Sequence, residues 1–155
     1  MSVRKEIIGG LITALEAVKS DSSYPITVKS VHEFDENYLT FDNHDVPAIF
    51  VNDTGSETLL VRHGSSYKKE ASFFILGFVH ADSKAGLRKN LNDTKSFIEQ
   101  FIDSTSGSDI HASCQALEFV ESESLYYQSQ EEPNQMMGSV TISVSLRYFI
   151  ASGAF

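Results

Sequence analysis

Apolar side chains recur at helical spacing in two segments of the chain. In the first segment, steps of mostly three or four positions relate the apolar residues Ile7, Ile8, Leu11, Ile12, Leu15 and Val18. In the second, which follows the N-cap candidates Asp82 and Ser83, similar steps relate Leu87, Leu91, Thr94, Phe97, Ile98, Phe101 and Ile102. This spacing gathers the residues on one stripe of a helix. We therefore expect two amphipathic helices, each packed on a core through one side.

Other apolar segments have the two-residue period of β-strands. Residues 140–150 alternate apolar and polar side chains, which predicts a strand with one core face and one wet face. Residues 67–81 form the longest β-segment in the first half of the chain. Shorter β-runs are expected at 26–31, 46–53, 57–62 and 116–127, with turns or polar loops at 53–56, 104–108 and 129–138. The acidic segment 33–45 is expected to be a long loop or a short edge hairpin.

The order of these elements indicates the fold class. Consecutive strands joined by short turns favour an antiparallel sheet, and both helices can pack on one of its faces. A length of 155 residues matches one domain with one core. We therefore predict a single α+β domain over residues 1–155, with a mainly antiparallel sheet and two amphipathic helices on one face.

The strand predicted at residues 67–81 is apolar on both faces. One face carries Ala71, Phe73, Ile75 and Val79, and the other carries Phe74, Leu76 and Phe78. A strand with one face in water would alternate with polar residues instead. Two alternatives remain for the second face: a helix of the same chain covers it, or it is buried in an interface between subunits, where aromatic residues are common.

Acidic and basic residues are segregated along the chain, whose net charge is −9. No lysine or arginine occurs from Ser30 to Val61 or from Ser96 to Leu146, and both stretches are rich in Asp and Glu. A fold that gathers these stretches would present a negative surface, which repels nucleic acid and favours oriented self-association. The acidic balance argues against a duplex-binding protein, because phosphate binding requires clustered Lys and Arg.

The sequence lacks motifs for catalysis or cofactor binding. The five histidines have no metal-ligand spacing, and the glycines lack the pattern of phosphate-binding loops. The single cysteine, Cys114, has no flanking cation to lower its pKa and is expected to be a small buried side chain. No segment has the apolar length that a bilayer requires, and the N-terminus does not resemble a signal peptide. We expect no enzymatic activity, cofactor or metal.

Five segments together resemble the tail terminator proteins of long-tailed bacteriophages, which cap the tail tube at the end near the head. They are the opening helix 7–18, the run Val46-Pro47-Ala48-Ile49-Phe50-Val51, the strand 73–79, the helix 87–102 and the closing strand 140–150. The resemblance spans nearly the whole chain and lies in the pattern of these elements. Related folds occur in the tail tube and head-completion proteins of the same phages.

The resemblance implies a non-enzymatic subunit of a ring, expected to be a hexamer, that ends polymerisation of the tail tube and offers a surface to the filled head. It implies contacts with other copies of itself, with the tail tube protein and with a head-completion or connector protein. DNA would pass without specific binding, and no membrane would be involved. The implied location is the head-proximal end of the virion tail, after assembly in the host cytoplasm.

Within such a ring, the residues themselves suggest two kinds of surface. Closed rings use heterologous contacts, which opposite charges on two sides of a subunit can strengthen. The predicted interface residues are Phe74, Leu76, Phe78, Lys68, Lys69, Arg88 and Lys89. A predicted acidic surface, on which DNA would slide without adhering, comprises Glu33, Asp35, Glu36, Asp42, Asp45, Glu131 and Glu132.

Two other functions fit the same sequence. A tail tube protein or a head-completion protein of the same virion would share the fold and differ in copy number, because tube rings stack whereas a terminator forms one ring. A soluble acidic binding module or small enzyme would instead be a monomer with a deep pocket lined by Asp35, Asp42, Asp45 and a histidine.

Overall fold

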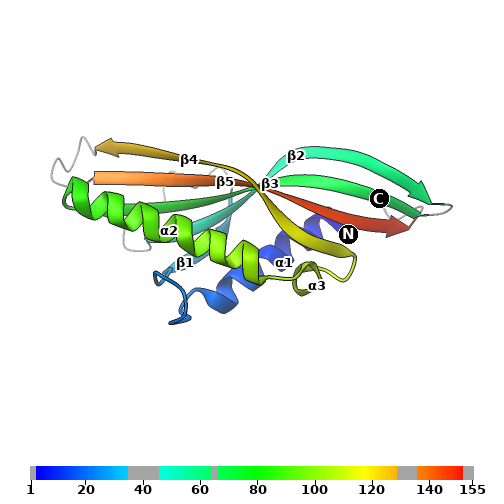
Figure 1. Cartoon of the computed structure of the whole chain (residues 1–155), viewed down its shortest axis with the longest axis horizontal. Helices are drawn as coiled ribbons and strands as arrows, with labels where there is room; N and C mark the ends of the chain where they lie inside the picture. The colour runs from blue at the N-terminus through cyan, green and yellow to red at the C-terminus, as the bar shows by residue number, and fades with distance from the viewer. Residues whose placement is uncertain (1–2, 35–45, 64–65, 129–135, 152–155) are drawn as a thin grey trace.

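The computed structural model describes residues 3–34, 46–63, 66–128 and 136–151. The elements along these residues are α1 (Val3–Val18), β1 (Ser30–Glu33), β2 (Ala48–His63), β3 (Ser66–Ala81), α2 (Lys84–Ser104), α3 (Gly107–Ile110), β4 (Cys114–Gln128) and β5 (Met136–Ala151). The helices lie on one side of a twisted sheet (Figure 1). The predicted α+β class with a mainly antiparallel sheet is confirmed.

The five described strands follow the order β1-β2-β3-β5-β4. β1 pairs with β2 in parallel over four residues, and the other neighbouring strands pair in antiparallel fashion. β3 pairs with β5 along its whole length, from Ser66 opposite Ala151 to Ala81 opposite Met136. β3 is thus the middle strand of the sheet, with β2 on one side and β5 on the other.

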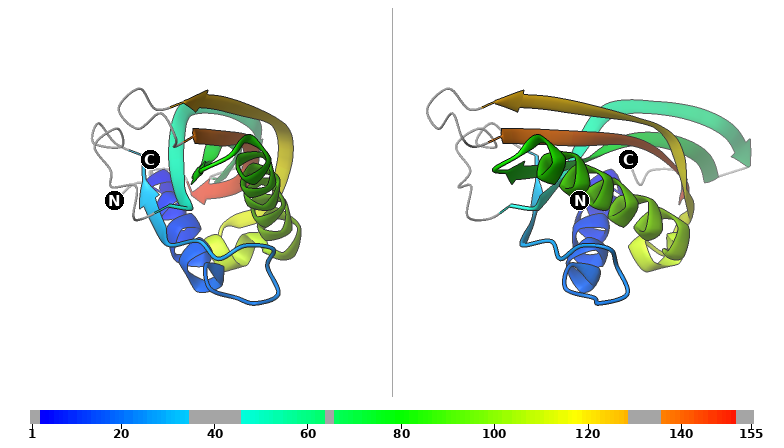
Figure 2. Two further views of the ribbon diagram at one scale, coloured as in Figure 1. Left: turned by 90° about the vertical axis from the view of Figure 1, so that its left-hand side faces the viewer. Right: turned by 60° about the vertical axis from the view of Figure 1, so that its left-hand side comes forward.

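The main core lies between the helices and one face of the sheet. The two helical stripes predicted from the sequence supply much of it, and β5 contributes its alternating apolar residues from Val140 to Ile150. Figures 1 and 2 show α1 and α2 beneath this same face. Among the largest fully buried side chains are Phe73, Phe97, Phe101, Leu11, Leu15, Ile75 and Ile142.

At Gly77 the helix α2 closely approaches the sheet. A Cβ atom at this position would lie 2.4 Å from the Thr94 Cγ2 atom on α2 and 3.2 Å from the Val140 Cγ1 atom on β5. Thr94 is fully buried, and its hydroxyl donates a hydrogen bond of 2.7 Å to the Asn90 carbonyl within the helix. The lack of a side chain at Gly77 therefore allows α2 to lie this close to the sheet.

We expect the substitution Gly77→Ala to lower the free energy of unfolding by about 1–3 kcal/mol, because the added methyl group overpacks this contact. Gly9→Ala is the matched control, since Gly9 lies within α1 and a Cβ there would meet no atom within 4 Å. That variant should gain up to about 1 kcal/mol from helix propensity. Urea unfolding of both variants measures the two changes, and equal effects would contradict the close approach.

β2 is longer than the sequence pattern predicts, because the turn expected at residues 53–56 is a bulge within one strand. Pairing with β3 shifts register between Asp53 and Glu57 and then continues to His63. Gly55 has a φ of 77°, a conformation that favours glycine. The prediction of a turn was wrong because β3 runs alongside both halves of β2 and keeps them in the sheet.

Three other element boundaries differ from the prediction. β1 spans only Ser30–Glu33, later and shorter than the expected run at 26–31. The loop expected at 104–108 is cut short, because residues 107–110 form the short helix α3, and the Asp109 carboxylate accepts a hydrogen bond of 3.2 Å from the Ser106 backbone N–H. β5 begins at Met136, because its first residues pair with both β3 and β4. The remaining loop segments, 35–45 and 129–135, lie outside the described residues.

The sheet continues past the C-terminal end of α2 (Figure 1). We call this extension the arm; it consists of residues 57–63 of β2, 66–71 of β3 and 146–151 of β5. Three large apolar side chains of the arm are exposed: Leu59 at 56%, Leu60 at 38% and Phe149 at 39%. The arm therefore combines regular strand pairing with an apolar surface in contact with water.

Candidate assembly surfaces

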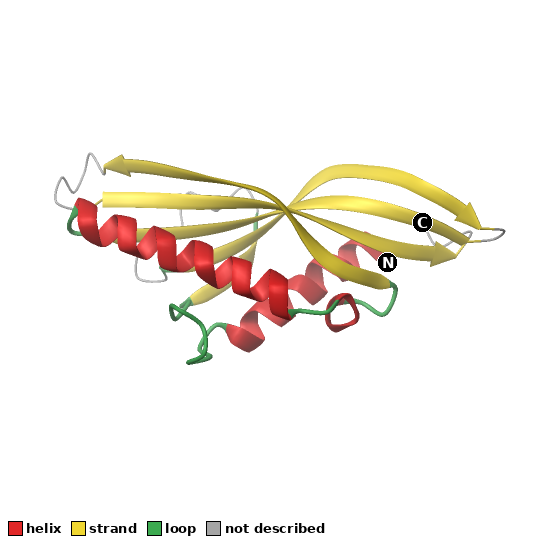
Figure 3. Ribbon diagram, viewed as in Figure 1, coloured by secondary structure: helices red, strands yellow, loops and turns green. Residues whose placement is uncertain are grey.

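The face of the sheet that points away from the helices, here called the outer face, is apolar over β2 and β3. Phe74, Leu76 and Phe78 alternate along β3 on this face and are half-buried. α1 and α2 pack on the opposite face (Figure 3). The alternative in which one of these helices covers the three residues is therefore wrong. Their assignment to a subunit interface stays a prediction.

Aromatic packing within the chain stabilises part of the outer face. Phe50 on β2 is only 3% exposed, and its ring centroid lies 5.4 Å from that of Phe78, with the ring planes at 88°. The Phe34 ring stands 6.4 Å from Phe50 at 80°. These edge-to-face pairs favour one fixed arrangement of rings. Val46 and Ala48 belong to the same cluster, so this apolar surface is already formed in the single chain.

The other half of the outer face is polar and acidic. Glu118, Glu121 and Glu123 of β4 are all exposed. Glu121 lies opposite Ser143 and Glu123 lies opposite Thr141 on β5, so a row of carboxylates runs beside a row of hydroxyl groups. The sequence prediction missed these three residues, although they belong to the second stretch without lysine. Their common placement follows from the register shift between Phe119 and Glu121, because in a regular strand Glu118 and Glu121 would lie on opposite faces.

The residues predicted for the acidic surface are not gathered in the described part of the chain. Glu33 is exposed at the end of β1, and β1 lies at the opposite edge of the sheet from β4. The other six lie outside the described residues: Asp35, Glu36, Asp42, Asp45, Glu131 and Glu132. Their place on a lumen or other surface stays a prediction.

The predicted basic interface residues fall into two separate groups. Lys68 and Lys69 lie on the arm, where Lys68 Nζ is 5.5 Å from the Phe149 ring centroid and Lys69 Nζ is 2.6 Å from Glu57 Oε1. Arg88 and Lys89 lie on α2 and are exposed, and Lys89 Nζ is 2.7 Å from Asp93 Oδ2. Lys69 is thus engaged within its own chain, whereas Arg88 faces water.

A polar network joins α1 to the arm. Arg4 Nε donates to Asp53 Oδ2 at 2.7 Å, and Arg4 Nη1 donates to Glu57 Oε2 at 3.1 Å. Tyr148 donates its hydroxyl proton to Glu57 Oε2 at 2.6 Å, while Lys69 binds the other oxygen. The Arg4 guanidinium also lies 5.1 Å from the centroid of the buried Phe73 ring. One arginine of the first helix therefore holds two acidic residues of β2.

The network shifts the pKa values of its members. Hydrogen bonding to Arg4 holds the pKa of Asp53 below its usual value. Partial burial alone would raise the pKa of Glu57, but the hydrogen bonds from Lys69 and Tyr148 lower it on balance. Burial, and then the bond to Glu57, raises the pKa of Tyr148. At neutral pH Asp53 and Glu57 are therefore carboxylates and Tyr148 is a neutral phenol.

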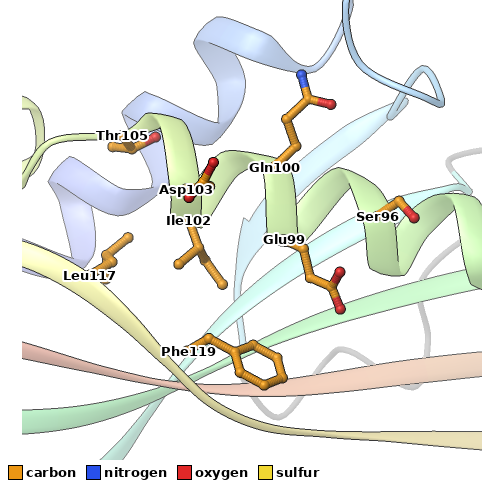
Figure 4. Close-up of a pocket in the computed structure, with 8 residues that line it drawn as sticks. All are labelled: Ser96, Glu99, Gln100, Ile102, Asp103, Thr105, Leu117 and Phe119. Atoms are coloured by element: carbon orange, nitrogen blue, oxygen red, sulfur yellow. The ribbon is translucent and has the colours of Figure 1, made fainter.

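A groove of about 910 Å³ lies between the C-terminal half of α2 and the edge strand β4 (Figure 4). We call it the α2–β4 groove. Ile102 and Leu117 give it an apolar base, and Phe119 is 48% exposed. The carboxylates of Glu99 and Asp103 belong to its lining, and Figure 4 shows Glu99 pointing toward Phe119. The groove thus offers an aromatic ring beside negative charge.

The surroundings of Cys114 do not favour a nucleophilic thiolate. The thiol is half-buried at the start of β4, and burial raises its pKa to about 12. The thiol is therefore protonated at neutral pH, as a structural side chain would be. Within the described ranges, no three His, Cys, Asp or Glu side chains converge so as to hold a metal ion.

None of the helices among the described residues is both long and apolar enough to cross a membrane.

Comparison with protein-family models and with curated proteins finds no match for the chain. Among solved structures, the chain is similar to a chain of the virion of a native gene transfer agent particle, with 11% identity and a TM-score of 0.45. This similarity covers 94% of the present chain and 95% of the other. The resemblance to tail terminator proteins thus stays a prediction.

Proposed function

We propose that this chain is a structural protein of a phage-type virion, and that its copies form a ring that caps the tail tube, ends tube polymerisation and presents the surface for joining the head. In this proposal the chain has no catalytic role. Its partners are other copies of itself, the tail tube protein and a head-completion or connector protein. DNA passes through the ring without specific binding.

The main support for the proposal is that a large part of the sheet is left uncovered by the helices and by other described strands. Among the described strands, β4 has a neighbour on one side only, and β1 pairs with β2 only from Ala48 to Val51. Unpaired strand edges tend to recruit further strands. Exposed apolar residues stand beside both edges: Leu59 and Leu60 on β2, and Phe119 and Val120 on β4. This combination is expected of a subunit whose contacts form on assembly.

Strand direction is compatible with a closed ring built by strand pairing. The successive antiparallel pairings of β2 with β3, β3 with β5, and β5 with β4 make β2 and β4 run in opposite directions. The free edge of β4 in one copy can therefore pair in antiparallel register with the free part of β2 in the next. Such a contact uses two different surfaces of each copy, which is the heterologous geometry of a ring.

The acidic row on β4 also fits the proposal. Glu118, Glu121 and Glu123 are exposed beside uncharged hydroxyl groups of β5. A surface dominated by carboxylates repels phosphates, and Arg147, the cation near Glu118, already pairs with Glu70. If it faces the lumen, DNA meets no attractive contacts as it passes.

Particles assembled without this chain provide the test. We expect tail tubes of irregular, excessive length and heads without tails, and we expect one ring of six copies in each normal particle. Tubes of normal length with heads attached would contradict the terminator function. Many copies along the tube would instead identify a tail tube protein, and a normal tube that fails only to join heads would identify a head-completion protein.

A further inference from the structure

The exposed charges of α2 have an uncommon order. Lys84 lies in the first turn and Arg88 one turn later; both are exposed, and neither forms an ion pair with another described residue. Toward the other end of the helix, Glu99 and Asp103 are exposed. The first turn contains no acidic residue and the last turn no basic one. The helix is thus cationic where it begins and anionic where it ends.

This order opposes the helix macrodipole. The N-terminal end of a helix has a partial positive charge and the C-terminal end a partial negative charge, so Lys84 and Asp103 each reduce the stability of α2. Stability of the single chain therefore does not explain these residues. Their effect is to strengthen the two poles of the helix, which makes each end more attractive to a charged partner.

The anionic end of α2 coincides with the α2–β4 groove. Glu99 and Asp103 line the groove together with the exposed ring of Phe119. Long basic side chains fit such a site, because their methylene groups pack on an aromatic ring while the cation reaches the carboxylates. Lys95 lies only 3.8 Å from Glu99, but this pair is on the surface, with both side chains at least 40% exposed. It leaves Asp103 available.

The two ends of α2 cannot meet within one chain. The helix from Lys84 to Asp103 spans roughly 28 Å at about 1.5 Å per residue. Two copies can bring them together, and each copy then gives its cationic end to one neighbour and its groove to the other. A contact of this type is heterologous and repeats around a ring.

We propose that the α2–β4 groove binds the cationic first turns of α2 from a neighbouring copy of this chain, with Lys84 and Arg88 held by Glu99 and Asp103 beside Phe119. This contact rests on the proposed ring, for which it supplies an intersubunit interaction. Lys89 is left out of the proposed contact because Asp93 on its own helix pairs with it at 2.7 Å, a much closer pair than Lys95 and Glu99 at 3.8 Å.

Charge reversal followed by mixing tests the contact. One variant carries Lys84→Glu and Arg88→Glu, and the other carries Glu99→Lys and Asp103→Lys. Each variant alone places like charges across the contact and should associate at least about tenfold more weakly than wild type. In an equimolar mixture, however, the acidic first turns of the first variant can face the basic groove of the second variant. The unchanged basic first turns of the second variant can likewise face the unchanged acidic groove of the first. We expect the mixture to regain wild-type association as rings of alternating copies, visible by native mass spectrometry, and wild-type association to weaken as salt is added.

The control Lys19→Glu with Lys29→Glu makes the same change in net charge as the first variant, at positions that do not line the groove, and should associate like wild type. Circular dichroism checks folding, and the Lys84→Glu variant should be at least as stable as wild type because it removes a charge that opposes the macrodipole. Variants that associate normally, or a mixture that stays dissociated, would overturn the contact while leaving the ring intact. A wild-type chain that is monomeric at every concentration would contradict both the contact and the proposed ring.

Discussion

Replacing Phe73 by alanine is expected to lower the free energy of unfolding by about 3–5 kcal/mol, whereas the same change at its neighbour Phe74 should lower it by about 1 kcal/mol. Phe73 on β3 is fully buried beneath the helices. Loss of its ring leaves a cavity that the surrounding packed side chains do not fill. Phe74 is half-buried on the outer face, so part of its ring is already in water. Urea unfolding of the two variants measures the difference.

The variants at Phe73 and Phe74 also distinguish an effect on folding from an effect on assembly. If the outer face lies in a subunit interface, as the sequence predicts, Phe74→Ala should weaken association at least about fivefold while the fold is retained, because truncation of a central aromatic residue often costs more than 1 kcal/mol in binding. Phe73→Leu serves as a milder core variant, in case Phe73→Ala fails to fold. An unchanged association constant for Phe74→Ala would remove Phe74 from the predicted interface.

Removal of the Arg4 side chain is expected to have the second large effect. Arg4→Ala leaves the partly buried carboxylates of Asp53 and Glu57 without their shared cation, and it should lower the free energy of unfolding by about 1–3 kcal/mol at pH 7. Because these two residues belong to β2 at the base of the arm, the arm should also lose protection from amide hydrogen exchange. Lys29→Ala, which removes an exposed cation elsewhere, is the control and should change stability by less than about 0.5 kcal/mol.

The pH dependence of the network has a definite sign. The pKa values of Asp53 and Glu57 are lower in the folded chain than in the unfolded chain. Their contribution to stability is therefore present above the unfolded value of about 4 and is lost as pH falls through the folded value. Wild type should lose more stability between pH 5 and pH 3 than Arg4→Ala does. Equal losses in urea unfolding at these two pH values would show that Arg4 is not responsible for the shifts.

Local periodicity was sufficient to predict the elements with buried stripes. α1, α2, β3 and β5 lie within a few residues of their predicted limits, because burial of one side imposes a period of 3.6 on a helix and of 2 on a strand. The segment at Asp53 to Ser56 was misread, because glycine and polar residues suit both a turn and a bulge. Whether the chain reverses there depends on the neighbouring strand, about which the local sequence says nothing.

The candidate surfaces depend more strongly on tertiary structure. The sequence by itself determined that β3 is apolar on both faces and that acidic residues are concentrated in two stretches. Only the fold decided which face the helices cover, and that Glu118, Glu121 and Glu123 form a row beside β5.

The Arg4 network and the α2–β4 groove have no counterpart in a sequence pattern. The network unites Arg4, Asp53, Glu57 and Tyr148, and the groove joins the end of α2 to β4. A periodic pattern shows only which side of its own segment is buried. Contacts between distant segments depend instead on strand order and on where each helix crosses the sheet, and these were decided only when the chain packed around one core.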